Sequence, residues 1–209
     1  MLSALLLACA AAVSAFNATG PYGLHIAGKE DATIDGYAGA CHAGAAIEGL
    51  CYVDGPLNET YTYQQFYFNY SSYDPTTGEV YPYGWIEWEL PFTSGESGEV
   101  ETEPSALQII LNLGSNVNTA LFYPGISEYT NLQFHPENGS VYISGGYDDS
   151  NFNATYPSSP TYLGDLTNWY LCYQFTGGYY YQSIAWVTSQ PPSNPSCAPV
   201  DLSLVEISY

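Results

Sequence analysis

The sequence WYLCYQFTGGYYYQSIAWV, residues 169–187, is the stretch that decides the fold class. Two runs rich in aromatic and aliphatic side chains, 169–175 and 179–187, lie on either side of Gly177 and Gly178. Aromatic and β-branched side chains favour a pleated strand, and paired glycines supply the positive backbone angles of a tight hairpin turn. The stretch therefore predicts two antiparallel strands joined at the glycine pair.

Similar short segments recur along the whole chain. We expect further strands at residues 61–70, 84–90, 106–113, 119–123, 132–134, 141–144 and 202–207. Only residues 38–50 offer a helical pattern, which three glycines interrupt. Residues 94–104, rich in Gly, Ser and Glu, predict a mobile surface loop. Together these segments predict an all-β fold, a single-domain antiparallel β-sandwich or barrel with disulfides.

The charge balance excludes several classes of function. Lys29 is the only Lys or Arg beside 21 acidic residues, so the formal net charge is -20. Nucleic-acid affinity comes largely from cations that neutralise phosphates, and this chain has almost none. We therefore expect no binding to nucleic acids or to anionic membranes at neutral pH.

The first residues predict export. Residues 2–13 form an apolar run, followed by a small-residue pattern at Val13, Ser14 and Ala15 that suits signal peptidase. The run is too short to span a membrane as a helix. We therefore expect a signal peptide at residues 1–15, a single secreted β domain at residues 16–209, and no membrane span.

Cysteine usage agrees with an oxidising compartment. Cys9 lies in the predicted leader, which leaves Cys41, Cys51, Cys172 and Cys197. Four cysteines allow three disulfide connectivities; short loops favour Cys41–Cys51 and Cys172–Cys197. The alternative is a zinc site, but neither pair has the close spacing that such sites prefer. We expect disulfides, no metal and no cofactor.

Five Asn-x-Ser/Thr sequons, none with a central Pro, predict an N-glycosylated protein. Several lie beside turn-forming residues, so we expect them to mark surface loops. The five asparagines are Asn17, Asn58, Asn69, Asn138 and Asn153.

Glu87 and Glu89 form the sharpest pair of carboxylates. Residues two apart on a strand share one face, with Cα atoms about 6.5 Å apart. Glycosidases use two carboxyl groups, one of them as an acid. The alternative is an acidic stripe that faces solvent, opposite buried Trp85, Ile86 or Trp88.

Two further groups of side chains are candidates for ligand binding. Tyr179 and Tyr181 lie in an aromatic run that suits stacking on sugar rings, although exposed Tyr also serves cross-strand pairing. His42 and Glu48 lie in a block of small residues between Cys41 and Cys51, where they are either polar occupants of a close-packed segment or part of a pocket wall.

The stretches GYAGACHAGAAIEGLCY, residues 36–52, and NWYLC, residues 168–172, through PSC, residues 195–197, resemble an uncharacterised family of small secreted proteins of filamentous fungi. The resemblance covers most of the predicted mature chain and its four cysteines. It implies a fungal extracellular protein and carries over no activity.

The sequence thus favours a secreted extracellular or cell-wall glycoprotein without catalytic activity, such as a glycan-binding or host-interacting, effector-like module. The expected partner is an extracellular polysaccharide or a host protein. The alternative is a glycoside hydrolase that uses paired carboxylates on a β-sandwich.

Overall fold

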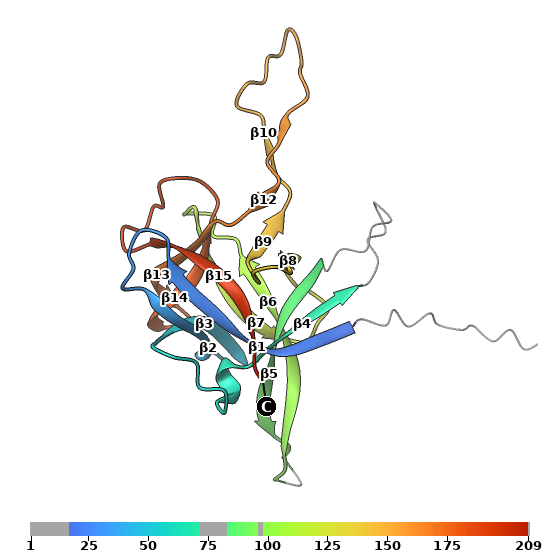
Figure 1. Cartoon of the computed structure of the whole chain (residues 1–209), viewed down its shortest axis with the longest axis vertical. Coiled ribbons are helices and arrows are strands. Elements are labelled where there is room, and N and C mark those ends of the chain that lie inside the picture. Colours follow the sequence, from blue (N-terminus) through green and yellow to red (C-terminus); the bar gives the residue numbers. More distant parts are fainter. Residues whose placement is uncertain (1–16, 72–82, 96–97, 209) are drawn as a thin grey trace, which may run out of the picture.

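The protein is described by a computed structural model that covers residues 17–71, 83–95 and 98–208 (Figure 1). The predicted signal peptide, residues 1–15, lies outside these described residues. The strands are β1 (Asn17–Gly28), β2 (Asp35–Gly44), β3 (Ile47–Asp54), β4 (Phe66–Ser71), β5 (Tyr83–Thr93), β6 (Val100–Ile110), β7 (Val117–Pro124), β8 (Leu132–Phe134), β9 (Val141–Ser144), β10 (Tyr147–Asp148), β11 (Thr161–Tyr162), β12 (Asp165–Leu166), β13 (Trp169–Thr176), β14 (Tyr179–Val187) and β15 (Ala198–Glu206), with one 3-10 helix, η1 (Thr62–Gln64).

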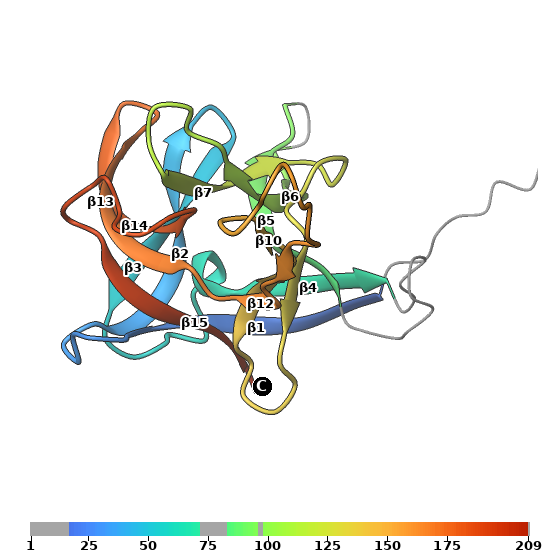
Figure 2. The same ribbon diagram turned by 90° about the horizontal axis from the view of Figure 1, so that it is seen from above.

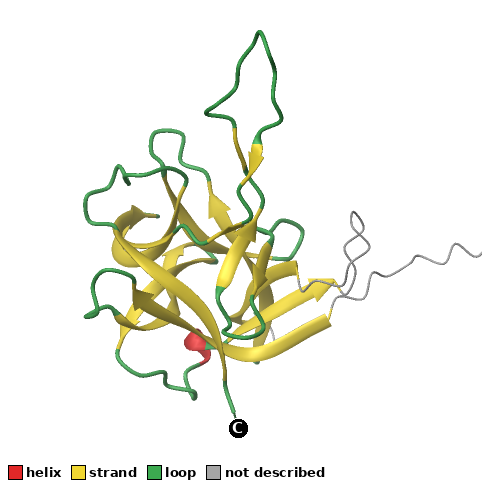
Figure 3. Ribbon diagram, turned by 45° about the horizontal axis from the view of Figure 1, so that its top comes forward, coloured by secondary structure: helices red, strands yellow, loops and turns green. Residues whose placement is uncertain are grey.

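The main sheet closes into an antiparallel barrel. Thirteen strands belong to this sheet, in the order β12-β9-β8-β5-β4-β1-β15-β13-β14-β3-β7-β6, with β2 beside β1 and β3. Because β5 also pairs with β6, the nine strands from β5 to β6 form a ring. Figure 2 looks toward one end of this ring, and Figure 3 shows that strands make up most of its wall. The predicted all-β class is confirmed, with the barrel as its form.

Side chains of alternate residues fill the barrel. On β5, Ile86 and Trp88 point inward and join a core that includes Phe122 from β7 and Trp169 from β13. Trp169 and Trp186 meet edge to face at 4.9 Å between ring centroids. Burial of these large aromatic side chains supplies much of the driving force for closing the sheet.

The hairpin of β13 and β14 forms as the sequence predicts. Thr176 pairs with Tyr179 across the turn, and Gly177 and Gly178 have φ angles of 61° and 98°. These positive angles match the requirement of a two-residue hairpin turn. The turn also packs on the β2–β3 hairpin, because a Cβ atom at Gly177 would overlap the carbonyl oxygen of Ala43.

Two disulfides, Cys41–Cys51 and Cys172–Cys197, confirm the pairing that short loops favour. The first links β2 to β3. The second ties β13 to the segment before β15, where Cys172, Tyr170 and Val187 form a small second core on the outer side of the sheet. In the chain-entropy account such loops contribute about 3 kcal/mol each.

The helical expectation for residues 38–50 is wrong. This stretch forms most of the hairpin β2–β3, in which Ala38 pairs with Tyr52 and Ala40 with Leu50. Ala38 and Leu50 are fully buried in the barrel core, so tertiary packing overrides the helical preference of alanine.

Two boundaries also differ from expectation. Residues 61–65 are not strand, because η1 turns the chain there and β4 begins only at Phe66. The acidic end of the predicted loop at residues 94–104 is strand, since Glu101 pairs with Phe92 and Glu103 with Leu90. Pairing with β5 orders a segment whose composition alone favours a loop.

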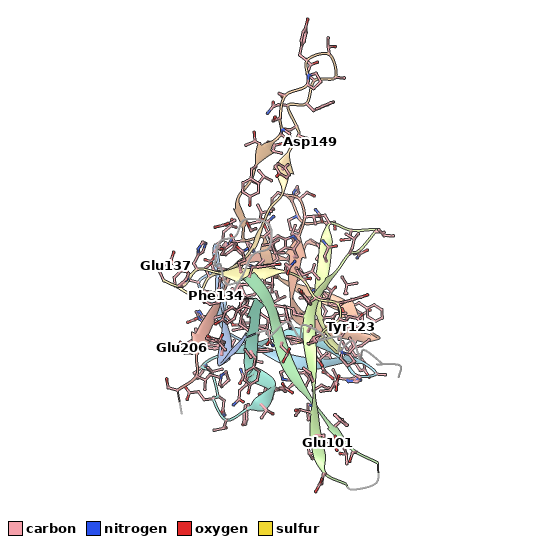
Figure 4. All side chains as sticks on the ribbon, turned by 90° about the vertical axis from the view of Figure 1, so that its right-hand side faces the viewer. Glu101, Tyr123, Phe134, Glu137, Asp149 and Glu206 are labelled. Atoms are coloured by element: carbon pink, nitrogen blue, oxygen red, sulfur yellow. A yellow bond between two sulfur atoms is a disulfide. The ribbon has the colours of Figure 1, made fainter. Side chains whose placement is uncertain are left out.

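Two ribbons project from opposite ends of the barrel. One carries β10 and β11 at the top of Figure 1, and the other is the end of the β5–β6 hairpin at the bottom. Figure 4 shows Asp149 on the upper ribbon and Glu101 on the lower one. The acidic side chains of one ribbon therefore lie far from those of the other, which lowers the repulsion between the two groups.

Lys29 lies just after β1 and joins two distant parts of the chain. Its Nζ atom donates to the Thr167 carbonyl oxygen at 2.9 Å and lies 3.4 Å from Asp201 Oδ1. No helix in the described ranges is both long and apolar enough to cross a membrane.

Candidate functional site

A groove of about 670 Å³ lies on the outer face of β4, β5 and β6. On β5 the inward positions are Ile86 and Trp88, so Glu87 and Glu89 both point outward into this groove. The predicted shared face of the two carboxylates is therefore confirmed. The other lining residues are Ala18, Thr62, Gln65, Tyr67, Pro91, Val100 and Thr102.

Glu87 is the most buried carboxylate of the groove, with 7% of the residue exposed. Its Oε2 atom accepts hydrogen bonds from Asn69 Nδ2 at 2.7 Å and from Trp85 Nε1 at 3.2 Å. The alternative of an acidic stripe is right that Ile86 and Trp88 are buried on the opposite face, but it is wrong for Trp85 and for the solvent exposure of Glu87. Trp85 and Glu87 are two residues apart on one strand, so they share a face.

Burial raises the pKa of Glu87. Loss of hydration is the largest cause, and the negative charge of Glu89 adds to it. The hydrogen bonds from Trp85 and Asn69 act in the opposite direction, because they stabilise the ionised form. A carboxyl group with a raised pKa keeps its proton to higher pH and is thus able to donate it to a ligand.

Trp85, which donates a hydrogen bond to Glu87, is itself part of an aromatic pair. Tyr129 stacks on Trp85 with 4.3 Å between ring centroids, and Trp85 is 1% exposed. The segment that carries Tyr129 is fixed to β6, since Thr130 N donates to the Leu107 carbonyl oxygen at 2.9 Å. The environment of Glu87 therefore depends on a segment about 40 residues further along the chain.

Strand pairing gives Glu87 neighbours that spacing along β5 alone does not reveal. Tyr67 lies directly opposite Glu87 on β4, and Asn69 opposite Trp85. Gln65 and Thr62 reach the same groove from η1 and the residues that follow it. The two-residue spacing of Trp85, Glu87 and Glu89 predicts that their side chains share one face of β5. Which residues of β4 lie opposite them depends on the strand register, which only the fold defines.

The arrangement is suited to hydrogen bonding with a polyhydroxylated ligand. Glu89 supplies acceptor oxygens, Gln65 an amide, and Thr62, Tyr67 and Thr102 hydroxyl groups. Pro91 and Val100 add apolar surface. This mixture of a few polar groups with apolar walls is typical of small-molecule sites.

The second group of predicted residues gathers at another place, at the tips of two hairpins. His42 Nδ1 lies 3.5 Å from Glu48 Oε1, and the His42 ring meets Tyr179 edge to face at 5.3 Å. Tyr179 in turn stacks on Tyr181 at 6.0 Å. Loss of hydration raises the pKa of Glu48, against the opposing effect of His42.

The structure brings these four residues together but places none of them in the groove with Glu87 and Glu89. Each of them touches another member of the set, and Glu48 is largely covered. The four residues are packing partners at the hairpin tips, and a ligand-binding role for them stays a prediction.

Metal-ligating groups do not assemble in the described part of the chain. No three His, Cys, Asp or Glu side chains there are placed to hold an ion together. His25 pairs with Asp35 at 2.7 Å, while His135 lies 3.5 Å from Asp165. Each histidine therefore has its own acidic partner.

The sequons differ in their surroundings. Asn138 and Asn153 are exposed in turns, and each side-chain oxygen accepts a hydrogen bond from the backbone N–H two residues later. Asn58 makes the same contact with Thr60. Asn17 lies in β1. The expectation of a surface loop does not hold for Asn69, which is 8% exposed within β4.

Comparison with known proteins gives no match: no family model, no curated protein and no solved structure is similar to this chain. The geometry of the chain itself therefore carries the functional argument.

Proposed function

We propose that the chain is a secreted, N-glycosylated protein that binds neutral carbohydrate in the groove over β4, β5 and β6 without catalysing a reaction. Its place is outside the cell or in the cell wall, in agreement with the resemblance to small secreted fungal proteins. The observation that carries the proposal is the groove itself, which combines carboxylate, amide and hydroxyl groups with apolar walls.

Charge supports a neutral ligand. With Lys29 as the only Lys or Arg, and bound to Thr167 and Asp201, the chain has no cation to offer an anionic sugar. Carboxylates such as Glu89 accept strong hydrogen bonds from the uncharged hydroxyl groups of a sugar, and no cation is needed for this contact. Two disulfides are compatible with an oxidising extracellular medium.

A glycan array with the secreted, disulfide-bonded protein tests the proposal. We expect retention of a neutral oligosaccharide, and a loss of about tenfold in affinity for Glu89→Ala, the change expected when one good charge-assisted hydrogen bond is removed. Glu103→Ala is the matched control. This substitution removes the same charge from the same β5–β6 ribbon, but Glu103 does not line the groove. An array with no retained sugar would contradict the proposal and favour a host protein as the partner.

Glycoside hydrolysis is the second candidate, and the raised pKa of Glu87 beside Glu89 favours it. Glu87 would protonate the leaving oxygen while Glu89 serves as base or nucleophile. Against it, both carboxylates rise from one strand, whereas glycosidases place theirs on two sides of the scissile bond. Release of reducing sugar by wild type but not by Glu87→Gln would establish this activity.

A further inference from the structure

A long part of the chain is free of charged side chains. Between Asp165 and Asp201 there is no Asp, Glu, Lys, Arg or His, although charged residues make up 11% of the chain. This stretch forms β13, β14, the loop after them and the start of β15. On a molecule with a net charge of -20, this stretch adds no charge of its own to the surface.

Three large aromatic side chains are exposed side by side on this surface. Phe175 pairs directly with Tyr180 across the hairpin, with ring centroids 4.9 Å apart. Tyr173, two residues before Phe175 on β13, is a diagonal neighbour of Tyr180, with 5.9 Å between ring centroids and ring planes 16° apart. Tyr173, Phe175 and Tyr180 are 54%, 63% and 62% exposed. We call these three residues the aromatic row.

The backbone beneath the aromatic row is fixed. The Tyr173 N–H donates to Ser196 Oγ at 2.9 Å, and the Tyr173 carbonyl oxygen accepts a hydrogen bond from Asn194 Nδ2 at 3.0 Å. The Cys172–Cys197 disulfide holds the same loop against β13. The strand edge at Tyr173 is thus occupied, so a partner has the side-chain faces to contact rather than the backbone.

The surface is also free of N-glycan acceptors. None of the five sequons lies between Asp165 and Asp201. Asn194 would begin a sixth, but Pro195 occupies the central position before Ser196, and a central proline prevents modification. No N-glycan is therefore expected within this stretch.

We propose that the aromatic row is a binding surface for a neutral polysaccharide, whose sugar rings lie on the side chains of Tyr173, Phe175 and Tyr180. Aromatic faces favour contact with the apolar C–H face of a sugar ring, while tyrosine hydroxyls and the exposed amide of Gln182 bind its hydroxyl groups. An uncharged surface matches an uncharged ligand. A second copy of the chain fits less well, because two molecules of charge -20 repel each other.

This surface is distinct from the groove and adds to the proposed recognition of soluble sugar. The test measures depletion of the secreted, disulfide-bonded protein from solution by insoluble cellulose, chitin and β-1,3-glucan. We expect retention on at least one of them, with little dependence on salt because no ion pair is involved. Affinity should fall about tenfold in Tyr180→Ala and in Phe175→Ala, and persist in Tyr180→Phe, which keeps the ring.

Tyr147→Ala and Tyr162→Ala are the matched controls, since these residues form another exposed cross-strand aromatic pair at 5.6 Å. Their retention should equal that of wild type. Glu89→Ala should also be retained on the solid, while Tyr180→Ala should still bind soluble oligosaccharide. The two variants thus test the aromatic row and the groove independently of each other. The proposal is overturned by no retention on any of the three solids, by equal losses in the controls, or by a concentration-dependent dimer that Tyr180→Ala disperses.

Discussion

Glu87 holds its carboxyl group between Asn69 and Trp85 on the outer wall of a barrel, where burial disfavours the ionised form. Its pKa is higher in the folded than in the unfolded chain, so over the intervening pH range the folded state holds a proton that the unfolded state has released. The contribution of Glu87 to stability is therefore complete below the ordinary carboxyl pKa and is lost as the pH rises through the raised value.

Glu87→Gln should remove the loss of folding stability that accompanies ionisation of Glu87 at higher pH. Glutamine keeps an acceptor oxygen for Asn69 and Trp85 but never ionises, so we expect the Tm to rise by roughly 2–4 °C at about pH 8, and to stay unchanged near pH 4. Thermal melts at the two pH values measure it. Glu89→Gln, at a more exposed position of the same groove, should give the smaller gain; equal gains would show that net charge and not burial is responsible.

Asn69 should carry no glycan in the folded, secreted protein. A glycan is attached through Nδ2, the atom that donates to Glu87 Oε2 at 2.7 Å in a buried strand. Glycopeptide mass spectrometry should find this sequon unmodified, with Asn138 and Asn153 modified. A glycan on Asn69 in correctly folded protein would mean that the contact with Glu87 is absent.

At the scale of elements, the turn of the β13–β14 hairpin makes a contact that only glycine allows. Gly177→Ala should destabilise the protein by about 2–3 kcal/mol, because the new Cβ overlaps the Ala43 carbonyl oxygen. Gly178→Ala, with a positive φ in the same turn but open space around it, should cost only the backbone strain of about 1 kcal/mol. Urea unfolding compares the two; equal costs would contradict the contact.

Local sequence was sufficient for elements whose own side chains alternate strongly. The bounds predicted for β9 and β14 agree with the structure, as does the hairpin turn at Gly177. It was insufficient for β2 and β3, whose Gly and Ala residues carry little strand signal and are ordered by packing in the core. Likewise, spacing alone placed Glu87 and Glu89 on one face, whereas the contacts of Asn69 with Glu87 and of Tyr129 with Trp85 depend on the fold.

At the scale of the whole molecule, net charge and the burial of carboxyl groups both make the folded state more stable at lower pH. Repulsion among 21 acidic residues weakens as they take up protons, and Glu48 and Glu87 both have raised pKa values. We therefore expect the mature protein to be more stable at about pH 4–5 than at about pH 8. Thermal melts should show this order, with added salt narrowing the difference through screening; a higher Tm at about pH 8 would contradict it.

The single lysine has one more consequence, for digestion. Trypsin-like enzymes cut after Lys or Arg, so the entire chain offers them one peptide bond, Lys29–Glu30, and an acidic residue follows it. With Nζ occupied by Thr167 and Asp201, even that side chain has to leave its partners before it enters a protease pocket. Resistance to this class of enzyme is therefore encoded in the composition and persists when the barrel unfolds.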